Sequence, residues 1–555
     1  MFTLHAHSTY SLLQGVISID DLITSAKKSD SRYVALTDTN GMYGLIQFAK
    51  RAEEQNIKPI LGAWIDSPNN KNINAIFLAK NNEGYSELCK IITSRKLKDD
   101  FSLINLIHEL PDNLFILTSS LEFLEQLTLN SKLRKNLYVE LIVTEKQKGH
   151  TRKLYHFARK NNLQIVATHP AYFLASKDFL LHKTVTAIRL NTTIENLQES
   201  DLVDPEFGLK TPQELNAVWK ALPEAIWNAD YIAKHCNINL KFGKYKFPGF
   251  PLPKGESAFS YLWKIAFRGL EDRYKPITDK AVKRLQYELE VIDDLGYSDY
   301  FLIVWDIVRE AHKRNMLTVG RGSAADSLVA YCLGLTQIDP VKHNLYFERF
   351  LNRGRTSPPD VDIDFSWKER DEIVKYVFEK YGYDHVAMIS TTITFRARSA
   401  FRETAKVFGI SEQEIAKFNK LIPWTSAKNL PYLTQKFPET KSLKLDIEPW
   451  ETIVCIASKL AGFPRHNSIH PSGIVITKKP IINYIALEYA KNKGLGLIVT
   501  QPDMYSVENM GLVKIDLLSQ RSLGVLRDTL ESISSLSRIK TKNPKIFLLK
   551  ETKEL

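Results

Sequence analysis

Apolar and polar positions in residues 1–235 follow two alternating patterns. Short apolar runs typical of buried strands begin at five places, namely Tyr33, Ile73, Leu114, Leu137 and Gln164. Between them, stretches such as 19–28 and 42–55 place apolar residues at the three- and four-residue spacing of an amphipathic helix. Strands that alternate with helices predict an α/β domain with a parallel sheet, either open or closed as a barrel.

The pattern changes after residue 236 and divides the remaining chain into shorter pieces. Residues 244–255 are rich in Pro and Gly and are predicted to form a linker. The pattern then predicts a set of helices at 258–315, followed by a glycine-bearing turn, a helix and an acidic strand at 317–365. It further predicts a basic helical segment at 389–459 and two late strands, at 474–477 and 511–516. No internal repeat is found.

The composition excludes several classes of protein. The chain has 555 residues, 44% of them hydrophobic and 25% charged, which is a globular composition of about three to five domains. No apolar run approaches the roughly 18 residues of a membrane-spanning helix, and the start does not read as a signal peptide. The four cysteines are far apart and form no CxxC pair, which fits a reducing compartment. We therefore expect a cytoplasmic protein.

Positive charge is concentrated in one part of the chain. The net charge is +12, and residues 389–479 alone contain 14 Lys and Arg against 7 Asp and Glu. A cationic region of this kind favours a polyanionic partner, because contacts with phosphates release condensed counterions. The alternative is an ordinary solvated helical surface, and charge alone does not separate the two.

The strongest chemical signal is the acidic segment PPDVDIDF at 358–365. On a strand, Asp360, Asp362 and Asp364 share one face, while Val361 and Ile363 share the other. Carboxylates held so close repel one another, and Mg²⁺ relieves that repulsion because it prefers carboxylate oxygens and substrate phosphates. The alternative is an edge strand with its charges in solvent.

A second signal lies just upstream, in VGRGSAAD at 319–326. Gly320 and Gly322 allow backbone N–H groups to approach a ligand, and Ser323 is predicted to open the following helix, beside the positive charge of Arg321. Alone the motif is usually just a turn, but with an acidic strand about 40 residues later it suggests a nucleoside triphosphate. Arg349 can reach the same phosphates, although a lone arginine is more often a surface charge.

The late strand GLVKIDLL at 511–518 carries one more carboxylate. Lys514 and Asp516 share one face of this strand, and Val513, Ile515 and Leu517 share the other. A single aspartate on a strand is usually structural, so its meaning depends on whether this strand lies beside the acidic one.

With these residues in place, the chain resembles the family of bacterial DNA polymerase III alpha subunits, the family C DNA polymerases. The resemblance covers about residues 1–530 and is carried by the segments LHAHSTYSLL, VALTDTNGMYGLIQF, KPILGA, VGRGSAADSLVAYCLG, LYFERFLN, PPDVDIDF and GLVKIDLL. The segments ITFRARSAFR and AGFPRHNSIH look most similar to the error-prone branch of the family.

The resemblance implies an α/β multidomain fold. It consists of a polymerase-and-histidinol-phosphatase (PHP) type, barrel-like (β/α) domain, then a nucleotidyltransferase-like palm with an inserted, mostly helical thumb. The implied boundaries are 1–235 for the PHP-type domain, 236–388 for the first part of the palm, 389–469 for the thumb, 470–530 for the second part of the palm and 531–555 for the start of the fingers or a tail.

The resemblance also implies the chemistry, which is DNA-directed DNA synthesis in replication or in error-prone repair. Asp360, Asp362 and Asp516 match the family's ligands for two Mg²⁺ ions, whereas Asp364 fits the motif without being a ligand. The positions implied to bind the dNTP are Arg321, Gly322, Ser323 and Arg349. Those implied to contact primer-template DNA are Lys514, Arg396, Arg398, Arg402 and Arg465.

The PHP-type domain departs from the family pattern. His5, His7 and Asp38 are retained, but other metal-binding positions are replaced, at Gln14, Thr39, Trp64, Pro170 and Tyr172. Trp and Pro offer no lone pair to a metal, so a full trinuclear site is excluded and His5 and His7 are left as a weak remnant. We therefore expect a structural scaffold and no phosphoesterase activity. His169 is either a substitute ligand or a core histidine, and the second interpretation is favoured.

The chain also ends soon after Asp516, where family members continue into the rest of the fingers, a clamp-binding region and an OB fold. The expectation is a polymerase fragment whose remaining portion is on another chain. The alternative is a truncated, catalytically inactive module for DNA binding or assembly. A neighbouring reading frame that encodes the missing parts would favour the first.

Overall fold

The computed structural model describes residues 3–354, 359–490 and 497–536. The chain forms two compact units, each built from several segments. Unit 1 contains Met1–Phe242, Ser390–Ile469 and Ile482–Met510, and unit 2 contains Gly243–Ile389, His470–Ile481 and Gly511–Leu555. Residues 482–510 therefore cluster with unit 1, although the sequence reading had included them in the range 470–530. The range 531–555 lies outside the described residues from 537 onward.

The first domain of unit 1 is built on a six-stranded sheet in the order β1-β2-β3-β4-β5-β6. Its strands are β1 (Tyr33–Leu36), β2 (Lys58–Ser67), β3 (Asn70–Ala79), β4 (Leu114–Thr118), β5 (Leu137–Ile142) and β6 (Gln164–Thr168). The predicted parallel sheet is found in part: β1–β2, β4–β5 and β5–β6 pair parallel, but β3 pairs antiparallel with both β2 and β4. Only two residues separate β2 from β3, and such a short connection forces a hairpin.

The N-terminal segment joins the two ends of this sheet. His7 N–H donates to the carbonyl of Ala171, which follows β6, and Thr37 N–H, just after β1, donates to the carbonyl of Ala6. A parallel bridge also pairs Ala6 with Ala171. The sheet is therefore curled, with His5 and His7 on the segment that spans its two edges.

Helices cover this sheet as the sequence periodicity predicts. α1 (Ile19–Lys28) has the predicted bounds; it begins after Ser18, whose hydroxyl accepts a hydrogen bond from Asp21 N–H, and its buried residues are Ile19, Leu22, Ile23 and Ala26. The remaining helices are α2 (Leu45–Glu54), α3 (Asn82–Leu97), α4 (Leu103–Leu106), α5 (Leu121–Leu127), α6 (Lys148–Lys160), α7 (Phe179–Leu190), α8 (Pro212–Val218) and α9 (Pro223–His235).

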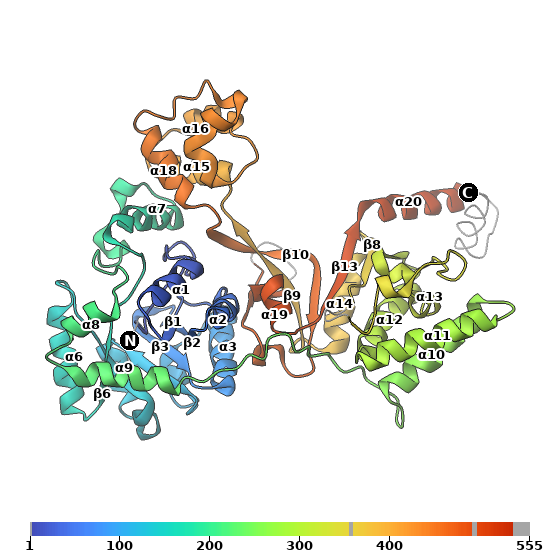
Figure 1. The fold of residues 1–555 in the computed structure, drawn as a ribbon, viewed down its shortest axis with the longest axis horizontal. Helices are drawn as coiled ribbons and strands as arrows, with labels where there is room; N and C mark the ends of the chain where they lie inside the picture. Colours follow the sequence, from blue (N-terminus) through green and yellow to red (C-terminus); the bar gives the residue numbers. More distant parts are fainter. Residues whose placement is uncertain (1–2, 355–358, 491–496, 537–555) are drawn as a thin grey trace. The chain divides into compact units, whose positions relative to one another are not determined.

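The basic segment of unit 1 is helical, as predicted. It contains α15 (Ala397–Val407), α16 (Glu412–Leu421), α17 (Leu433–Lys436) and α18 (Trp450–Lys459), which gather into one body in Figure 1. Its core includes Phe401 and Ile453 and is continuous with Phe173 and Val185 of the first domain, so the helical body rests on α7. Burial of this shared apolar surface fixes the two parts of unit 1 to each other.

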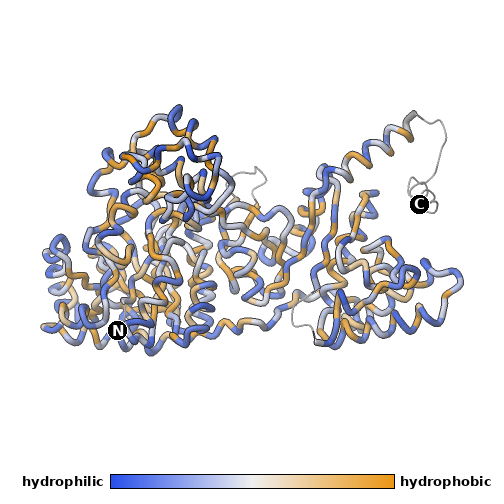
Figure 2. The backbone as a smooth tube through the Cα atoms, turned by 45° about the horizontal axis from the view of Figure 1, so that its top comes forward, coloured by the Kyte–Doolittle hydropathy of each residue, from blue (hydrophilic) through white to orange (hydrophobic). Residues whose placement is uncertain are grey.

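Unit 2 combines helices with a row of four neighbouring strands and the start of a fifth, β9 (Val386–Thr394). The helices are α10 (Ala258–Arg273), α11 (Asp279–Asp294), α12 (Ser298–Lys313), α13 (Leu328–Cys332), α14 (Arg370–Tyr381) and α20 (Arg521–Leu536). Polar and apolar positions alternate along α20 in Figure 2, as in an amphipathic helix. The strands are β7 (Thr318–Arg321), β8 (Asp362–Ser366), β13 (Lys514–Gln520) and the second half of β10 (Pro464–Ile476), in the order β10-β13-β8-β7.

Two strands connect the units along the chain. β9 (Val386–Thr394) and β10 each begin in one unit and end in the other. β11 (Leu487–Tyr489), β12 (Ile498–Asp503) and α19 (Met504–Asn509) belong to unit 1. Among the described residues, none of the helices has the length and apolar character needed to cross a membrane.

Candidate functional site

Strand register brings the acidic residues of unit 2 side by side. β13 runs parallel to β8, with Asp516 opposite Asp362, and antiparallel to β10, with Gly473 opposite Asp516. On the other edge of β8, Arg321 of β7 pairs with Asp362. One row across four strands therefore reads Gly473, Asp516, Asp362 and Arg321.

Three carboxylates converge at this row. Asp360, Asp362 and Asp516 each offer an oxygen, and these oxygens lie within 4.8 Å of one another. The predicted convergence is therefore confirmed. Burial, followed by the negative charges of Asp360 and Asp516, raises the pKa of Asp362. A cluster of carboxylates with this mutual repulsion can bind a metal ion, because a cation removes the repulsion.

Two donors orient the buried carboxylate of Asp516. Lys514 Nζ lies 2.6 Å from Asp516 Oδ2, and the hydroxyl of Ser472 donates to Asp516 Oδ1 at 2.8 Å. Lys514 was predicted at this site. Ser472 was missed, because it lies 44 residues away on β10 and only the strand register brings it opposite the carboxylate.

Asp364 has a different environment from Asp362, the other acidic residue of β8, and from Asp360, which lies just before the strand. It is buried, and its Oδ1 accepts hydrogen bonds from Arg321 Nε at 3.1 Å and from Gln520 Nε2 at 3.3 Å. Arg321 also lies 3.9 Å from Asp362 Oδ2. Asp364 therefore pairs with the Arg321 side chain and is not among the three converging carboxylates.

The two glycines of the upstream turn are required for different reasons. Gly320 lies in β7, where a Cβ would come within 2.0 Å of the carbonyl of Leu335, so its role is close packing. Gly322 has a φ of +71°, and a Cβ there would meet nothing within 4 Å. The open space lies beside Gly322, next to the partly exposed Ser323. Of the two glycines, only Gly322 fits the prediction that the backbone at this turn can approach a ligand.

The helix predicted to open at Ser323 begins later. Gly322–Asp326 forms a 3₁₀ turn, and α13 starts at Leu328 with Ser327 as its cap. Ser327, and not Ser323, caps the helix because its hydroxyl accepts a hydrogen bond from the Ala330 N–H in the first turn. Arg349 ends a second 3₁₀ turn, Phe347–Arg349, and its exposed side chain lies 3.9 Å from Asp326.

The four arginines predicted to contact DNA from the basic segment lie in unit 1. Arg402 pairs with Glu412 at 3.5 Å, and Arg465 donates to Glu403 at 2.7 Å. Arg398 uses Nε to hold the carbonyl of Ile422. Arg396 is exposed, and no ion pair is found for it within the described residues. Of the four, Arg396 is thus the most available for a phosphate.

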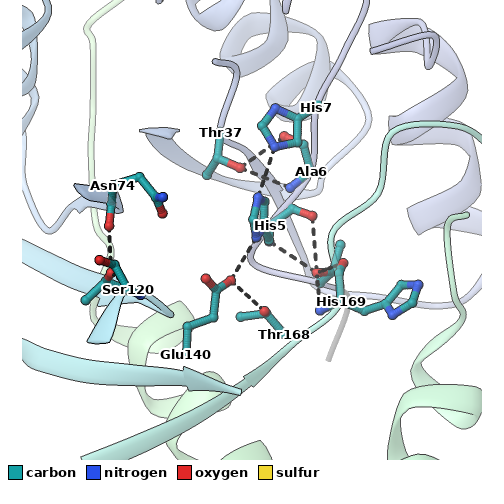
Figure 3. Close-up of polar contacts among 11 residues, drawn as sticks. His5, Ala6, His7, Thr37, Asn74, Ser120, Glu140, Thr168 and His169 are labelled. Atoms are coloured by element: carbon teal, nitrogen blue, oxygen red, sulfur yellow. Dashed lines mark hydrogen bonds and ion pairs between the residues drawn. The ribbon is translucent and has the colours of Figure 1, made fainter. Parts of the chain in front are cut away.

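The histidine pair of the first domain is held in a buried polar network (Figure 3). His5 Nδ1 lies 2.8 Å from Glu140, and His5 Nε2 lies 3.0 Å from His7 Nε2. Burial acts to raise the pKa of Glu140, but His5 and the hydroxyl of Thr168 stabilise the carboxylate and the net pKa is lowered. Burial, together with His5, holds the pKa of His7 well below its usual range. These side chains satisfy one another without a metal.

The replaced positions close the rest of this pocket. Tyr172 stacks on His7 with ring centroids 4.0 Å apart, and Thr39 Oγ1 lies 3.2 Å from His7 Nδ1. Asp38 accepts hydrogen bonds from Ser8 and Ser11, and burial raises its pKa to about 6. Across residues 3–354, 359–490 and 497–536, the one group of three or more His, Cys, Asp or Glu placed to hold a metal is the triad of unit 2. The residues present here do not fit a multinuclear centre.

We expect no phosphoesterase or exonuclease activity from the first domain, because its remaining polar groups pair with one another. The full chain would be given single-stranded DNA and a chromogenic phosphoester with Mn²⁺ and Zn²⁺. No turnover is expected. Turnover abolished by His5→Ala would contradict this, whereas turnover lost only in Asp360→Ala would come from the triad.

Two further buried histidines of this domain should make stability depend on pH. His182 donates from Nδ1 to the carbonyl of Gln14 and accepts at Nε2 from Val203 N–H, so it must be neutral. Burial lowers the pKa of His182 to about 4, and that of His169 to about 4 as well. As pH falls from 6.5 to 4, the two histidines take up protons in the unfolded chain before they do so in the folded chain. The free energy of unfolding therefore decreases in that pH range.

The loss is expected to reach roughly 3 kcal/mol for each histidine below pH 4. Urea unfolding at several pH values between 7 and 4.5 would measure it. His182→Gln has no titrating group, so its stability should fall less steeply than that of the unsubstituted chain. The same pH dependence in both proteins would contradict the assignment.

Carboxylates that converge beside a glycine turn are typical of enzymes that act on phosphates with metal ions. Comparison with known proteins makes this specific. A model described as the bacterial DNA polymerase III alpha NTPase domain matches residues 260–519, which include the whole triad, and a PHP domain model matches residues 3–158.

Curated relatives extend this similarity over nearly all of the chain. The DNA polymerase III subunit alpha of Bacillus subtilis is 33% identical, covering 98% of this chain and 50% of the relative. The error-prone DNA polymerase of Symbiobacterium thermophilum is also 33% identical, covering 96% of this chain and 52% of the relative. The chain belongs to the bacterial DNA polymerase III alpha family, and it spans about half the length of the curated relatives it matches. A DNA polymerase III alpha subunit and an error-prone DNA polymerase are equally identical to this chain, at 33%. Its assignment to the error-prone branch therefore stays a prediction.

Proposed function

We propose that the chain carries the nucleotidyl-transfer centre of a DNA-directed DNA polymerase. It joins a dNTP to the 3′-hydroxyl of a primer paired with template DNA, in replication or in repair synthesis. The observation that carries this proposal is the convergence of Asp362 and Asp516, on adjacent strands, with Asp360, which lies just before β8 and not on the strand where the sequence pattern predicted it. The three residues lie within a segment that matches the polymerase family model.

The donor set fits Mg²⁺. All three groups are carboxylates, which are the oxygen ligands that Mg²⁺ prefers, and burial together with the negative charges of Asp360 and Asp516 raises the pKa of Asp362. Two Mg²⁺ ions held by the triad would supply activation of the primer hydroxyl and neutralisation of charge on the departing pyrophosphate. Lys514 and Ser472 keep the Asp516 carboxylate turned toward its neighbours.

The phosphates of the dNTP would lie beside the glycine turn. Gly322 leaves open space there, and Ser323 presents a hydroxyl at its edge. Arg321 stands in the strand next to Asp362, and Arg349 extends an exposed guanidinium from the adjoining turn. These four residues provide the backbone amide, hydroxyl and cationic donors that a triphosphate requires.

A primer-extension experiment tests the proposal. The full chain would be mixed with a 5′-labelled primer-template, Mg²⁺ and one dNTP at a time. Incorporation of the templated nucleotide, and loss of incorporation in Asp360→Ala, is the expected result. Binding to primer-template without incorporation, at any Mg²⁺ concentration, would favour the alternative of a DNA-binding module.

A further inference from the structure

A pair of charged residues on α11 lies outside the triad yet contacts both phosphate-binding turns of unit 2. Glu288 is fully buried, and its Oε2 accepts from the hydroxyl of Ser327 at 2.8 Å and from Val329 N–H at 3.1 Å. Its other oxygen, Oε1, accepts from Arg284 Nε at 2.6 Å, one helical turn earlier. Glu288 therefore fixes the chain where the glycine turn passes into α13.

Arg284 extends the connection to the second turn. Its Nη2 donates to the carbonyl of Asp326, at the end of the glycine turn, at 3.2 Å. The same nitrogen donates to the carbonyl of Leu345 at 3.1 Å, just before the turn that carries Arg349. One guanidinium thus binds both segments at once.

A third residue of α11 contacts the second turn. The hydroxyl of Tyr287 donates to Glu348 Oε1 at 3.0 Å, and its ring packs edge-on against Phe347 with centroids 6.1 Å apart. Two segments far apart in sequence, 322–329 and 345–349, therefore rest on a single helix. Burial raises the pKa of Glu288, and the hydrogen bonds from the backbone and from Arg284 counter only part of this rise.

We propose that Arg284, Tyr287 and Glu288 are positioning residues that set the spacing between the glycine turn and Arg349 for binding of the nucleoside triphosphate. The inference rests on the proposed function. A rigid support matters here because a small displacement of groups that contact the substrate costs a large part of their binding energy. The three residues touch the two turns and not the triad, so they should affect nucleotide binding rather than DNA binding.

The test measures nucleotide and DNA binding separately in the full chain. Fluorescent dATP would be titrated onto the chain bound to primer-template with a templating thymine, in Ca²⁺ to prevent turnover. Glu288→Gln and Arg284→Lys are expected to weaken nucleotide binding about tenfold, and Tyr287→Phe by a smaller factor. Binding to primer-template should stay within twofold of the unsubstituted chain.

Asp306 offers a matched control in the same unit. It is fully buried on α12 and accepts from Arg309, Lys380, Tyr376 and Tyr381 at 2.7–3.1 Å. Asp306→Asn therefore disturbs a buried carboxylate network at least as large as that of Glu288. It should lower the unfolding temperature but leave the affinity for dATP unchanged.

Hydrogen exchange provides a readout of the support itself. Glu288→Gln should increase deuterium uptake in both 326–329 and 345–349, and Asp306→Asn in neither. This inference alone would be overturned if Glu288→Gln and Arg284→Lys bound dATP within twofold of the unsubstituted chain. An equal weakening of dATP binding in Asp306→Asn would also overturn it. An unsubstituted chain that binds no dATP would overturn the proposed function as well.

Discussion

Replacing Asp360 or Asp516 by Asn is expected to lower the single-turnover rate of nucleotide incorporation by about 10³-fold or more. Each substitution removes one negative charge from a cluster in which three carboxylate oxygens lie within 4.8 Å. The cluster then loses its attraction for divalent cations. The effect should appear in the rate at saturating dNTP and primer-template, measured by rapid quench with Mg²⁺.

Asp364→Asn is the matched control for this prediction. Asp364 lies on β8, four residues after Asp360, but its carboxylate is hydrogen-bonded to Arg321 and Gln520 instead of joining the triad. Its substitution should reduce the rate by less than about tenfold. Equal losses in Asp364→Asn and Asp360→Asn would contradict the distinction between them. Folding of each variant is checked by its unfolding midpoint, which should change little for the exposed Asp360.

Binding of the chain to primed duplex should weaken steeply with salt, by about 10³-fold between 50 and 200 mM if about six phosphates are contacted. The cause is the basic segment 389–479, with 14 Lys and Arg against 7 Asp and Glu. Fluorescence anisotropy over a series of salt concentrations gives the slope of log K against log salt. A flat slope, or no binding at low salt, would leave this segment as ordinary surface.

Single substitutions separate the contributing arginines. Arg396→Ala is expected to reduce the slope by about one unit, since each neutralised phosphate contributes about 0.9. Arg465→Ala should have a smaller effect, because Arg465 already donates to Glu403 at 2.7 Å. Equal changes in the two variants would show that this ion pair opens on DNA.

Local sequence patterns predicted much of the fold correctly. The bounds of α1 follow from Ser18 as a cap and from four buried positions at helical spacing, which are signals contained within a dozen residues. The strands of the first domain begin close to the predicted apolar runs. Their pairing was predicted less well, because the direction of β3 depends on the two-residue connection after β2, a strand that the apolar pattern had not identified.

The same limit explains the errors at the glycine turn. Gly320 and Gly322 look alike in sequence, but one faces the Leu335 carbonyl and the other has a left-handed backbone in open space. The difference arises from what the fold places near each residue. Likewise, Ser323 and Ser327 are both suitable helix caps, and the bonds of Ser327 to Ala330 and Glu288 decide between them.

For the candidate site, the sequence by itself determined which carboxylates come together. The two-residue repeat of Asp360 and Asp362, the late Asp516 and the resemblance to a polymerase family were sufficient to name the triad. The spacing of Asp360 and Asp362 involves only neighbouring residues, so it can be read from the chain, although β8 begins only at Asp362. Tertiary structure alone decided which strands pair, and with them the contacts of Ser472 with Asp516, of Arg321 with Asp364 and of Arg284 with two separate turns. Such contacts depend on register and packing between segments 40 or more residues apart, for which a single sequence carries no local signal.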